Sequence, residues 1–389
     1  MEYKIKELMN VNRGASPRPI IEFLTKSGYR WLKISDFKMY DRYVYDTKEY
    51  IIEDGLKKTR FLKKGTLILT NSATPGIPIF LGNDMCLHDG FLYFQNINET
   101  IIDIKYLYYW LLFNRNKIVS QANGSVFQNL KKEIVENFVI NVPNMKSQIK
   151  IVQILDSLNN KIELNNQIND NLHNLAEQQF TEIYKYGKEA TLEDLLENIS
   201  TGSRPKGGAQ STGIPSVGAE KIEKFGVYDY SSEKYISEEF YDKLKNGRMK
   251  SGDVLLYKDG AYTGKVSMCL NGFPHKKSAV NEHVFILNTK NNRAQNYLYF
   301  SLFNKENKEM LERMASSKAA QPGLNQVELK SLKINICDKE TIENFEIKVK
   351  PIMESIANNS LENKTLAELR YTLLPKLMNG EIDLDKIKF

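Results

Sequence analysis

The residues best suited to chemistry in this chain are its histidines and the carboxylates beside them. The sequence contains four histidines, His88, His173, His275 and His283. None has a cysteine or a second histidine at the spacing of zinc ligands, so we expect no metal site. Two histidines adjoin carboxylates, in the pairs His88–Asp89 and Glu282–His283. Such a pair can transfer protons, but a structural turn explains these two short segments better.

The sequence signatures of common catalytic sites are missing. There is no Gly-Lys-Ser/Thr phosphate loop, which argues against an ATPase. No glycine fingerprint leads from a strand into a helix, as a dinucleotide site requires. No nucleophile-elbow motif is present. We therefore expect a non-catalytic chain that carries no cofactor of its own.

Composition and charge indicate a chain that tolerates a polyanionic partner. The net charge is +6 over 389 residues, which permits such a partner without requiring one. The N-terminal segment is charged and no long apolar run occurs, so we expect a cytoplasmic location and no membrane contact. The three cysteines, Cys86, Cys269 and Cys337, show no pairing pattern, so we expect no disulfide.

The element that must position any binding residues is a long amphipathic helix. Residues 147–185 contain no proline or glycine, and their apolar residues alternate at spacings of four and three. This pattern predicts a coiled-coil helix of about four heptads over residues 146–186. Its predicted seam comprises Ile151, Leu155, Leu158, Ile162, Asn165, Asn169, Leu172, Ala176 and Gln179. One apolar stripe of this length needs a partner helix.

A matching helix is predicted 194 residues later, within 338–389. Its seam comprises Phe345, Val349, Ile352, Ile356, Asn359, Asn363, Leu366, Arg370 and Leu373. The two asparagines inside the first seam recur in the second, and a polar seam residue costs stability while it fixes the register. If the helices pair antiparallel, Asn165 faces Asn363 and Asn169 faces Asn359.

The repeat extends over the whole chain. The Arg18-Pro19 loop matches Arg204-Pro205, and FLKKGTLILT from Phe61 matches RMKSGDVLLY from Arg248. The aromatic runs beginning at Tyr106 and Tyr297 also match. We predict an α+β fold with an internal pseudo-two-fold repeat: a mostly antiparallel domain over 1–145, a helix over 146–186, a second domain over 187–337, and a helix with a C-terminal tail over 338–389. The aromatic runs are interpreted as core helices packed on the sheets.

Two similar domains held at a fixed spacing by rigid helices suit a ligand with repeating charge, and duplex DNA is the commonest one. Lysines and arginines would contact phosphates, while polar and aromatic loop side chains would reach base edges. The candidate DNA contacts are Arg18, Lys57, Lys58, Arg60, Asn71, Ser72, Thr74, Arg204, Lys206, Lys258, Tyr262, Thr263, Lys265, Lys276 and Lys277. A solvated lysine-rich surface on a protein-binding adaptor is the alternative that these residues leave open.

Three segments carry a family resemblance. They are the domain-to-helix junction VINVPNMKSQIKIVQILDSLNNKIELNNQI, the loop GDVLLYKDG, and the closing LRYTLLPKLMNGEI. With the domain–helix–domain–helix order, they resemble the specificity subunit of a type I restriction–modification enzyme over essentially the whole chain. The sequence departs from the family where Cys337 replaces the counterpart of Pro143, and where the first helix lacks the closing Gly-Glu-Ile. These departures concern the ends of the helices.

The resemblance implies a function. Each target-recognition domain would read one half of a bipartite DNA sequence, and the helix pair would set the gap between the halves. The helices would also dock two methyltransferase subunits and, through them, the restriction subunits. S-adenosylmethionine, ATP and Mg²⁺ would then bind to partner subunits only. The sequence does not reveal the DNA target, the gap length or the presence of a restriction subunit.

Overall fold

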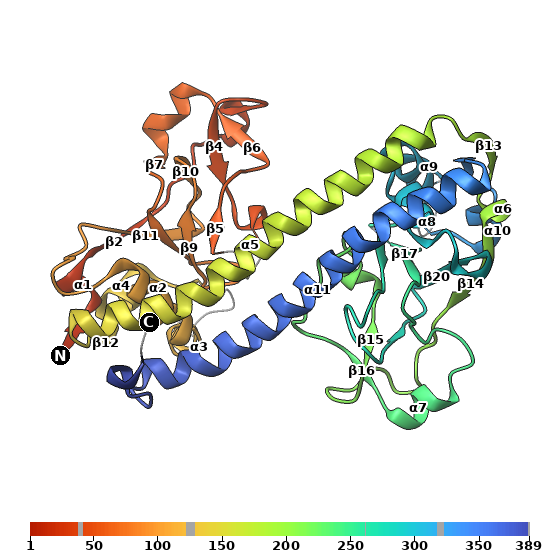
Figure 1. Cartoon of the computed structure of the whole chain (residues 1–389). Coiled ribbons are helices and arrows are strands. Elements are labelled where there is room, and N and C mark those ends of the chain that lie inside the picture. The colour runs from red at the N-terminus through yellow and green to blue at the C-terminus, as the bar shows by residue number, and fades with distance from the viewer. Residues whose placement is uncertain (38–41, 122–128, 261, 317–322, 388–389) are drawn as a thin grey trace. The chain divides into compact units, whose positions relative to one another are not determined.

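The two segments predicted as long helices form α5, Met145–Tyr184, and α11, Lys339–Met378, in the computed structural model. The structure describes residues 1–37, 42–121, 129–260, 262–316 and 323–387. These divide into unit 1, Met1–Leu158 with Glu368–Phe389, and unit 2, Asn159–Ala367. The boundaries between the units fall inside α5 and α11, the two long helices labelled in Figure 1, so each unit consists of one predicted domain and a part of both helices.

Unit 1 contains short strands and helices before α5. The strands are β1 Glu2–Lys4, β2 Asn10–Arg13, β3 Leu24–Thr25, β4 Tyr29–Leu32, β5 Tyr43–Val44, β6 Glu49–Ile51, β7 Arg60–Leu62, β8 Leu67–Thr70, β9 Pro78–Leu81, β10 Met85–Leu87, β11 Phe91–Gln95 and β12 Val139–Asn141. The α-helices are α1 Ile5–Leu8, α2 Ile104–Phe113, α3 Arg115–Ser120 and α4 Lys132–Asn137. The strands form sheets in the orders β2-β11-β8-β9-β5, β3-β6-β4-β10-β7 and β1-β12.

Unit 2 repeats this plan. Its strands are β13 Lys188–Thr191, β14 Leu196–Thr201, β15 Ile214–Val217, β16 Tyr235–Ile236, β17 Val254–Tyr257, β18 Val266–Met268, β19 Ala279–Val280, β20 Val284–Thr289 and β21 Lys333–Ile336. Its shorter helices are α6 Leu192–Leu195, α7 Glu238–Lys243, α8 Gln295–Phe303, α9 Lys305–Ser316 and α10 Gln326–Lys330. The sheets follow the orders β14-β20-β17-β18, β16-β15-β19 and β13-β21.

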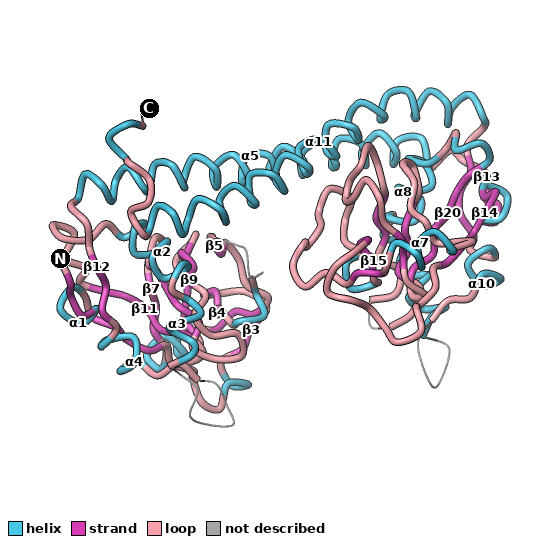
Figure 2. The backbone as a smooth tube through the Cα atoms, turned by 90° about the horizontal axis from the view of Figure 1, so that it is seen from below, coloured by secondary structure: helices cyan, strands magenta, loops and turns pink. Residues whose placement is uncertain are grey.

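The two units share their strand connections. The series β2-β11-β8-β9 in unit 1 has the same order as β14-β20-β17-β18 in unit 2, and both are antiparallel. In each unit a second sheet contains one parallel pair, β4 with β10 and β15 with β19. The predicted α+β class with two similar, mostly antiparallel domains is therefore confirmed, although each unit distributes its strands over several sheets (Figure 2).

The aromatic runs form core helices, as predicted. Asp103 caps α2 by accepting hydrogen bonds from the backbone N–H groups of Lys105 and Tyr106. The tyrosine rings of α2 and α8 are buried, with Tyr109 and Tyr297 both 0% exposed. Both helices pack in the main hydrophobic clusters of their units, so these rings stabilise the fold and are not available for base stacking.

The seam between the long helices lies where the heptad pattern predicts it. None of the predicted seam side chains on α5 or α11 is exposed. Within unit 2, Asn165 Nδ2 donates to Asn363 Oδ1 at 2.9 Å, and Asn359 Nδ2 donates to Asn169 Oδ1 at 2.9 Å. The antiparallel pairing predicted from the repeat is therefore present. That these asparagines specify the register stays a prediction.

The second long helix ends at a glycine that can adopt a left-handed conformation. Gly380 has φ +72° and donates its N–H to the carbonyl of Leu377, which stops the helix after Met378. The following tail packs on α5 within unit 1, where Lys150 Nζ donates to the carbonyl of Leu384 at 2.8 Å. The Asn-Gly-Glu-Ile motif therefore serves as a helix stop.

Candidate nucleic-acid interface

The arginine of each Arg-Pro loop lies beside a carboxylate. In unit 1, Arg18 Nη2 lies 3.6 Å from Asp89 Oδ2, and the arginine side chain is 82% exposed. In unit 2, Arg204 Nη1 lies 3.9 Å from Glu282 Oε1, and this arginine is 70% exposed. The two predicted contact arginines thus occupy the same kind of site in both domains, each with a counter-charge.

The two carboxylates stand at equivalent positions of the same backbone turn. The N–H of Gly90 donates to His88 Nδ1, and the N–H of His283 donates to Asn281 Oδ1, so Asp89 and Glu282 are each the middle residue. This turn leads into β11 in unit 1 and into β20 in unit 2. The interpretation of the His–carboxylate segments as turns is confirmed.

Several groups hold Asp89 in place. Ser16 Oγ donates to Asp89 Oδ1 at 3.1 Å, and Arg13 Nε donates to the Asp89 carbonyl at 2.8 Å. Burial lowers the pKa of His88, although Asp89 raises it, so the ring favours the neutral form that accepts from Gly90. Sequence reasoning missed Arg13 and Ser16 as members of this cluster, since only the pairing of β2 with β11 brings them to the turn.

The loop after β8 is mainly structural. Asn71 is 3% exposed, its Nδ2 donates to the Asp89 carbonyl at 3.2 Å, and its backbone accepts from Leu130. The buried side chain of Asn71 ties the loop to the Asp89 turn, so a contact between Asn71 and DNA stays a prediction that requires this side chain to leave the turn. Ser72 and Thr74 are partly exposed in the same loop.

The loop after β17 presents charged and aromatic side chains. Lys258 Nζ lies 3.8 Å from Asp259 Oδ2, and Asp259 Oδ1 lies 2.6 Å from His283 Nδ1. Tyr262 is 63% exposed, and Lys265 Nζ lies 4.7 Å from the centre of its ring. Lys265 also pairs with Glu223 at 2.7 Å, so a phosphate must compete with this carboxylate.

Thr263 in this loop is 5% exposed. Its hydroxyl donates to the Gly260 carbonyl at 2.8 Å. The hydroxyl thereby closes the turn and faces away from solvent, so a contact between Thr263 and DNA also stays a prediction that requires the turn to open.

The basic segment before β8 is exposed. Lys57, Lys58 and Arg60 are all exposed, and Lys58 Nζ lies 4.5 Å from the centre of the Phe23 ring. Arg60 is the register partner of Leu87, one residue before His88, so β7 carries Arg60 to the strand end that leads into the Asp89 turn. In unit 2, Lys206 is exposed in the Arg204 loop.

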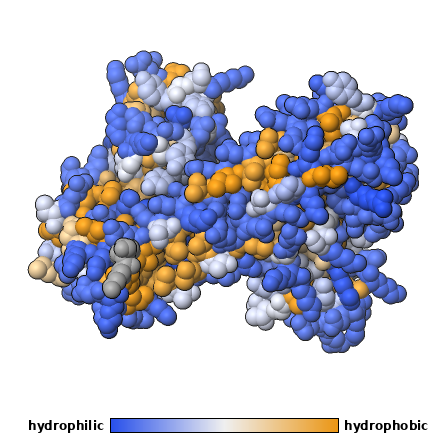
Figure 3. All heavy atoms as spheres, in the orientation of Figure 1, coloured by the Kyte–Doolittle hydropathy of each residue, from blue (hydrophilic) through white to orange (hydrophobic). Residues whose placement is uncertain are grey.

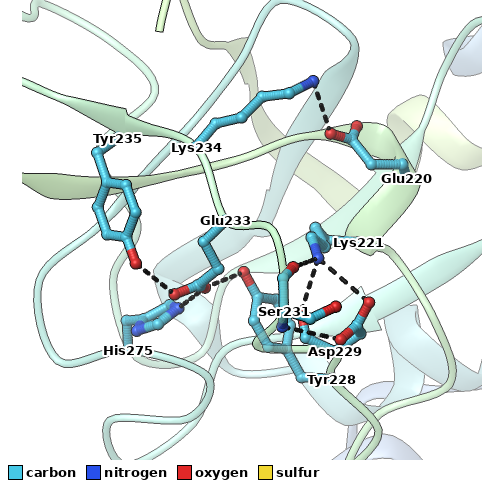
Figure 4. Close-up of polar contacts among 9 residues, drawn as sticks. All are labelled: Glu220, Lys221, Tyr228, Asp229, Ser231, Glu233, Lys234, Tyr235 and His275. Atoms are coloured by element: carbon cyan, nitrogen blue, oxygen red, sulfur yellow. Dashed lines mark hydrogen bonds and ion pairs between the residues drawn. The ribbon is translucent and has the colours of Figure 1, made fainter. Parts of the chain in front are cut away.

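A buried polar network supports Lys276 and Lys277. Figure 4 shows Glu233 accepting from His275 Nε2 at 2.6 Å and from the hydroxyls of Tyr228 and Tyr235. Burial opposes ionisation of Glu233, but these hydrogen bonds lower its pKa, so it is an anion at neutral pH. Both lysines follow His275 directly and are exposed. Lys277 pairs with Glu238 at 3.4 Å.

The described residues hold no group of three or more His, Cys, Asp or Glu side chains that could bind a metal ion. Across the same residues, no helix is long and apolar enough to cross a membrane. On the face seen in Figure 3, apolar side chains gather along the long helices amid a mainly hydrophilic surface.

A family model matches most of the chain. It describes the type I restriction modification DNA specificity domain, and it matches residues 1–174 and again residues 188–371. The chain belongs to this family. It is thus a specificity subunit with two specificity domains, a DNA-recognition chain that is not itself catalytic and that acts with DNA and partner subunits.

Two named relatives match this specificity subunit over most of its length. It is 25% identical to the type I restriction enzyme MjaIX specificity subunit of Methanocaldococcus jannaschii, across 99% of this chain and 94% of the relative. It is also 25% identical to the HindI specificity subunit of Haemophilus influenzae, across 82% of this chain and 87% of the relative. The two matched domains correspond to the two halves of the sequence repeat.

The fold of the specificity subunit has a solved counterpart. The crystal structure of the type I restriction–modification S subunit from M. genitalium aligns with 97% of this chain and 95% of its own, with a TM-score of 0.57 and 15% sequence identity. At this identity the likeness shows a shared fold alone. That fold is the arrangement of two similar domains and two long helices described above.

Proposed function

We propose that the two specificity domains read two different halves of a bipartite DNA site, while the helix pair sets the gap between the halves. The observation that carries this proposal is the repeated pairing of Arg18 with Asp89 and of Arg204 with Glu282 at equivalent turns. A repeated polar site on two copies of one domain suits two successive contacts with one polymer. The predicted domain boundaries, 1–145, 146–186, 187–337 and 338–389, are part of this proposal.

The two sites differ in the side chains around the shared pair. The first has Ser16, His88 and exposed Arg60 nearby, whereas the second has Lys258, Asp259 and His283. Different donors and acceptors on a common scaffold would select different base pairs. The two half-sites are therefore expected to differ in sequence.

We divide the proposed contacts by their chemistry. Lysines and the strand arginines Arg13 and Arg60 would bind phosphates and supply affinity that depends on salt. The arginines of the two Arg-Pro loops, the partly exposed hydroxyls and the Tyr262 ring would meet bases. The proposed phosphate contacts are Arg13, Lys57, Lys58, Arg60, Lys206, Lys258, Lys265, Lys276 and Lys277. The proposed base contacts are Arg18, Ser72, Thr74, Arg204 and Tyr262.

We also propose which partner subunits bind this chain. The helix pair would dock two methyltransferase subunits, which bind S-adenosylmethionine, and restriction subunits that use ATP and Mg²⁺ would join through them. Four asparagines would fix the register of the helix pair and so keep the spacing between the two specificity domains constant. They are Asn165 and Asn169 on α5, and Asn359 and Asn363 on α11. The complex would work on DNA in the cytoplasm.

The test is to co-express the chain with the methyltransferase subunit encoded beside it and to map methylated adenines across genomic DNA. We expect one bipartite motif with a constant gap. Exchanging residues 1–145 for the matching domain of a relative should change one half-motif and leave the other intact. A stable complex that methylates no defined motif would contradict the proposal and favour a protein-binding adaptor.

A further inference from the structure

A fixed carboxylate at the same place in both DNA-reading domains is unexpected on a surface that binds a polyanion. Asp89 and Glu282 each adjoin the proposed contact arginine of their domain. A carboxylate close to DNA phosphates costs binding free energy unless a donor reaches it. Each carboxylate therefore needs a hydrogen-bond donor when DNA is bound, and the DNA itself can provide one.

The arginine partners can leave the carboxylates cheaply. Their nitrogens lie 3.6 Å and 3.9 Å from the carboxylate oxygens, and the arginine side chains are 82% and 70% exposed. Exposed ion pairs of this kind contribute little to stability, so DNA can draw the arginine away. The carboxylates are less free, being only 30% and 32% exposed.

The remaining neighbours do not fully satisfy the carboxylates. Asp89 Oδ1 accepts from Ser16 Oγ, whereas Asp89 Oδ2 faces Arg18. Glu282 Oε1 lies near Arg204 and His283, while Glu282 Oε2 is buried and accepts no hydrogen bond from the described residues. The buried Glu282 Oε2 is out of reach of DNA. When the arginine turns to the DNA, Asp89 Oδ2 and Glu282 Oε1 lose their cation, and each can then accept from a new donor.

The base edges of the major groove carry only two kinds of amino donor, cytosine N4 and adenine N6. Guanine and thymine instead present the carbonyl acceptors O6 and O4 beside these positions, which repel a carboxylate. A carboxylate at this surface therefore favours one class of base and disfavours the other, and it also penalises a misplaced phosphate.

We propose that Asp89 and Glu282 are specificity-determining residues, each accepting a hydrogen bond from the amino group of one cytosine or adenine in its half-site. The inference rests on the proposed function, because it assumes that both domains read DNA. Each residue acts in its own domain, so each controls one base position in one half of the motif.

The test uses the complex of this chain with its methyltransferase subunit. Asp89→Asn and Glu282→Gln keep the shape of the side chain while they remove its charge. One matched control is Asp84→Asn, a partly exposed carboxylate that pairs with Lys63 at the other end of β10. The other is Glu193→Gln, an exposed carboxylate on α6 that pairs with Lys330. Methylated motifs are mapped genome-wide, and affinities for the cognate duplex and a scrambled duplex are measured at one salt concentration.

We expect Asp89→Asn to weaken the base preference at one cytosine or adenine position in one half-motif. Glu282→Gln should weaken the base preference at one position in the other half-motif. The ratio of cognate to scrambled affinity should fall roughly tenfold in each variant. The relaxed position identifies which of the two bases is read. Controls should keep the motif and the ratio.

Two results would overturn the inference. In one, the motif is unchanged while both duplexes bind more tightly by the same factor, which would make the carboxylates simple counter-ions. In the other, neither motif nor affinity changes in variants whose melting temperatures match the wild type. The proposed function fails separately, if the wild-type complex methylates no bipartite motif at all.

Discussion

His173 of α5 and Tyr299 of α8 share a hydrogen bond of 2.8 Å in the interior of unit 2. Burial and, to a smaller extent, the nearby Lys224 lower the pKa of His173 to about 4, while Asp170 opposes this shift. Glu177 Oε2 lies 3.9 Å from the other ring nitrogen. The imidazole is therefore neutral in the folded protein at physiological pH.

This burial predicts a pH dependence of stability. The folded pKa lies below the unfolded value of about 6.5, so the unfolded chain binds the proton first as the pH falls. The contribution of the neutral His173 to the free energy of unfolding is therefore complete above about pH 6.5. This contribution, about 3 kcal/mol, is lost as the pH falls from there to about 4. Calorimetry of the wild type and His173→Gln should show a smaller acid loss in the variant. Parallel pH profiles would contradict this.

A second prediction concerns Asp156 on α5, whose carboxylate contacts three side chains in unit 1. Arg42 Nη2 lies 2.6 Å from it, Lys105 Nζ 2.9 Å, and the Tyr109 hydroxyl donates at 2.7 Å. Burial raises the pKa of Tyr109, which keeps the hydroxyl a donor. Because Arg42 is 6% exposed, Asp156→Ala leaves a buried cation without its anion and should cost about 3–5 kcal/mol.

The matched control for Asp156 is Asp170→Ala on the same helix. Asp170 pairs with Lys224 and its side chain is 61% exposed, so its loss should cost less than about 1 kcal/mol. Calorimetric unfolding of both variants measures the difference. Equal destabilisation by the two substitutions would mean that Asp156 is not the anchor of Arg42.

The third prediction concerns coupling between Asn169 and Asn359. Asn169 Nδ2 also donates to Ser360 Oγ at 3.1 Å, and Ser360 Oγ donates to the Gly226 carbonyl. Asn169→Leu alone should lower the free energy of unfolding by about 1–3 kcal/mol, because it leaves buried polar groups without a hydrogen-bond partner. The double substitution with Asn359→Leu should cost less than the sum, with a coupling of at least about 0.5 kcal/mol. Additive losses in urea unfolding would show that the two amides act independently.

The fourth prediction concerns salt. If Lys265 leaves Glu223 to bind a phosphate, Lys265→Ala should weaken binding to all DNA sequences and lower the slope of log affinity against log salt by about one. The control is Lys333→Ala on β21, a 59% exposed lysine outside the candidate loops. An unchanged slope in a titration of fluorescent duplex would remove Lys265 from the phosphate contacts.

The fifth prediction separates Tyr262 from the cations. Its exposed ring carries no charge, so Tyr262→Ala should leave the salt slope unchanged and relax discrimination in one half-site. Competition between cognate and scrambled duplexes measures this. Equal losses of affinity on both duplexes would show that the ring contributes contact area without reading a base.

The sequence by itself determined the elements whose signals are local or repeated. The heptad spacing predicted α5 and α11, and the repeated asparagines predicted which residues face each other across them, because a helical period can be read from neighbouring residues. The aromatic runs at Tyr106 and Tyr297 were identified as core in the same way.

Only the tertiary structure decided the composition of the candidate DNA site. Arg18 meets Asp89, and Arg13 and Ser16 join them, because β2 pairs with β11 and β10 pairs with both β4 and β7. Such contacts are set by strand pairing between distant segments, which no local spacing reveals. The pairing of β8 with β11 brings the buried Asn71 to the same turn, and a tight turn buries Thr263, although both lie in polar loops that looked exposed in the sequence.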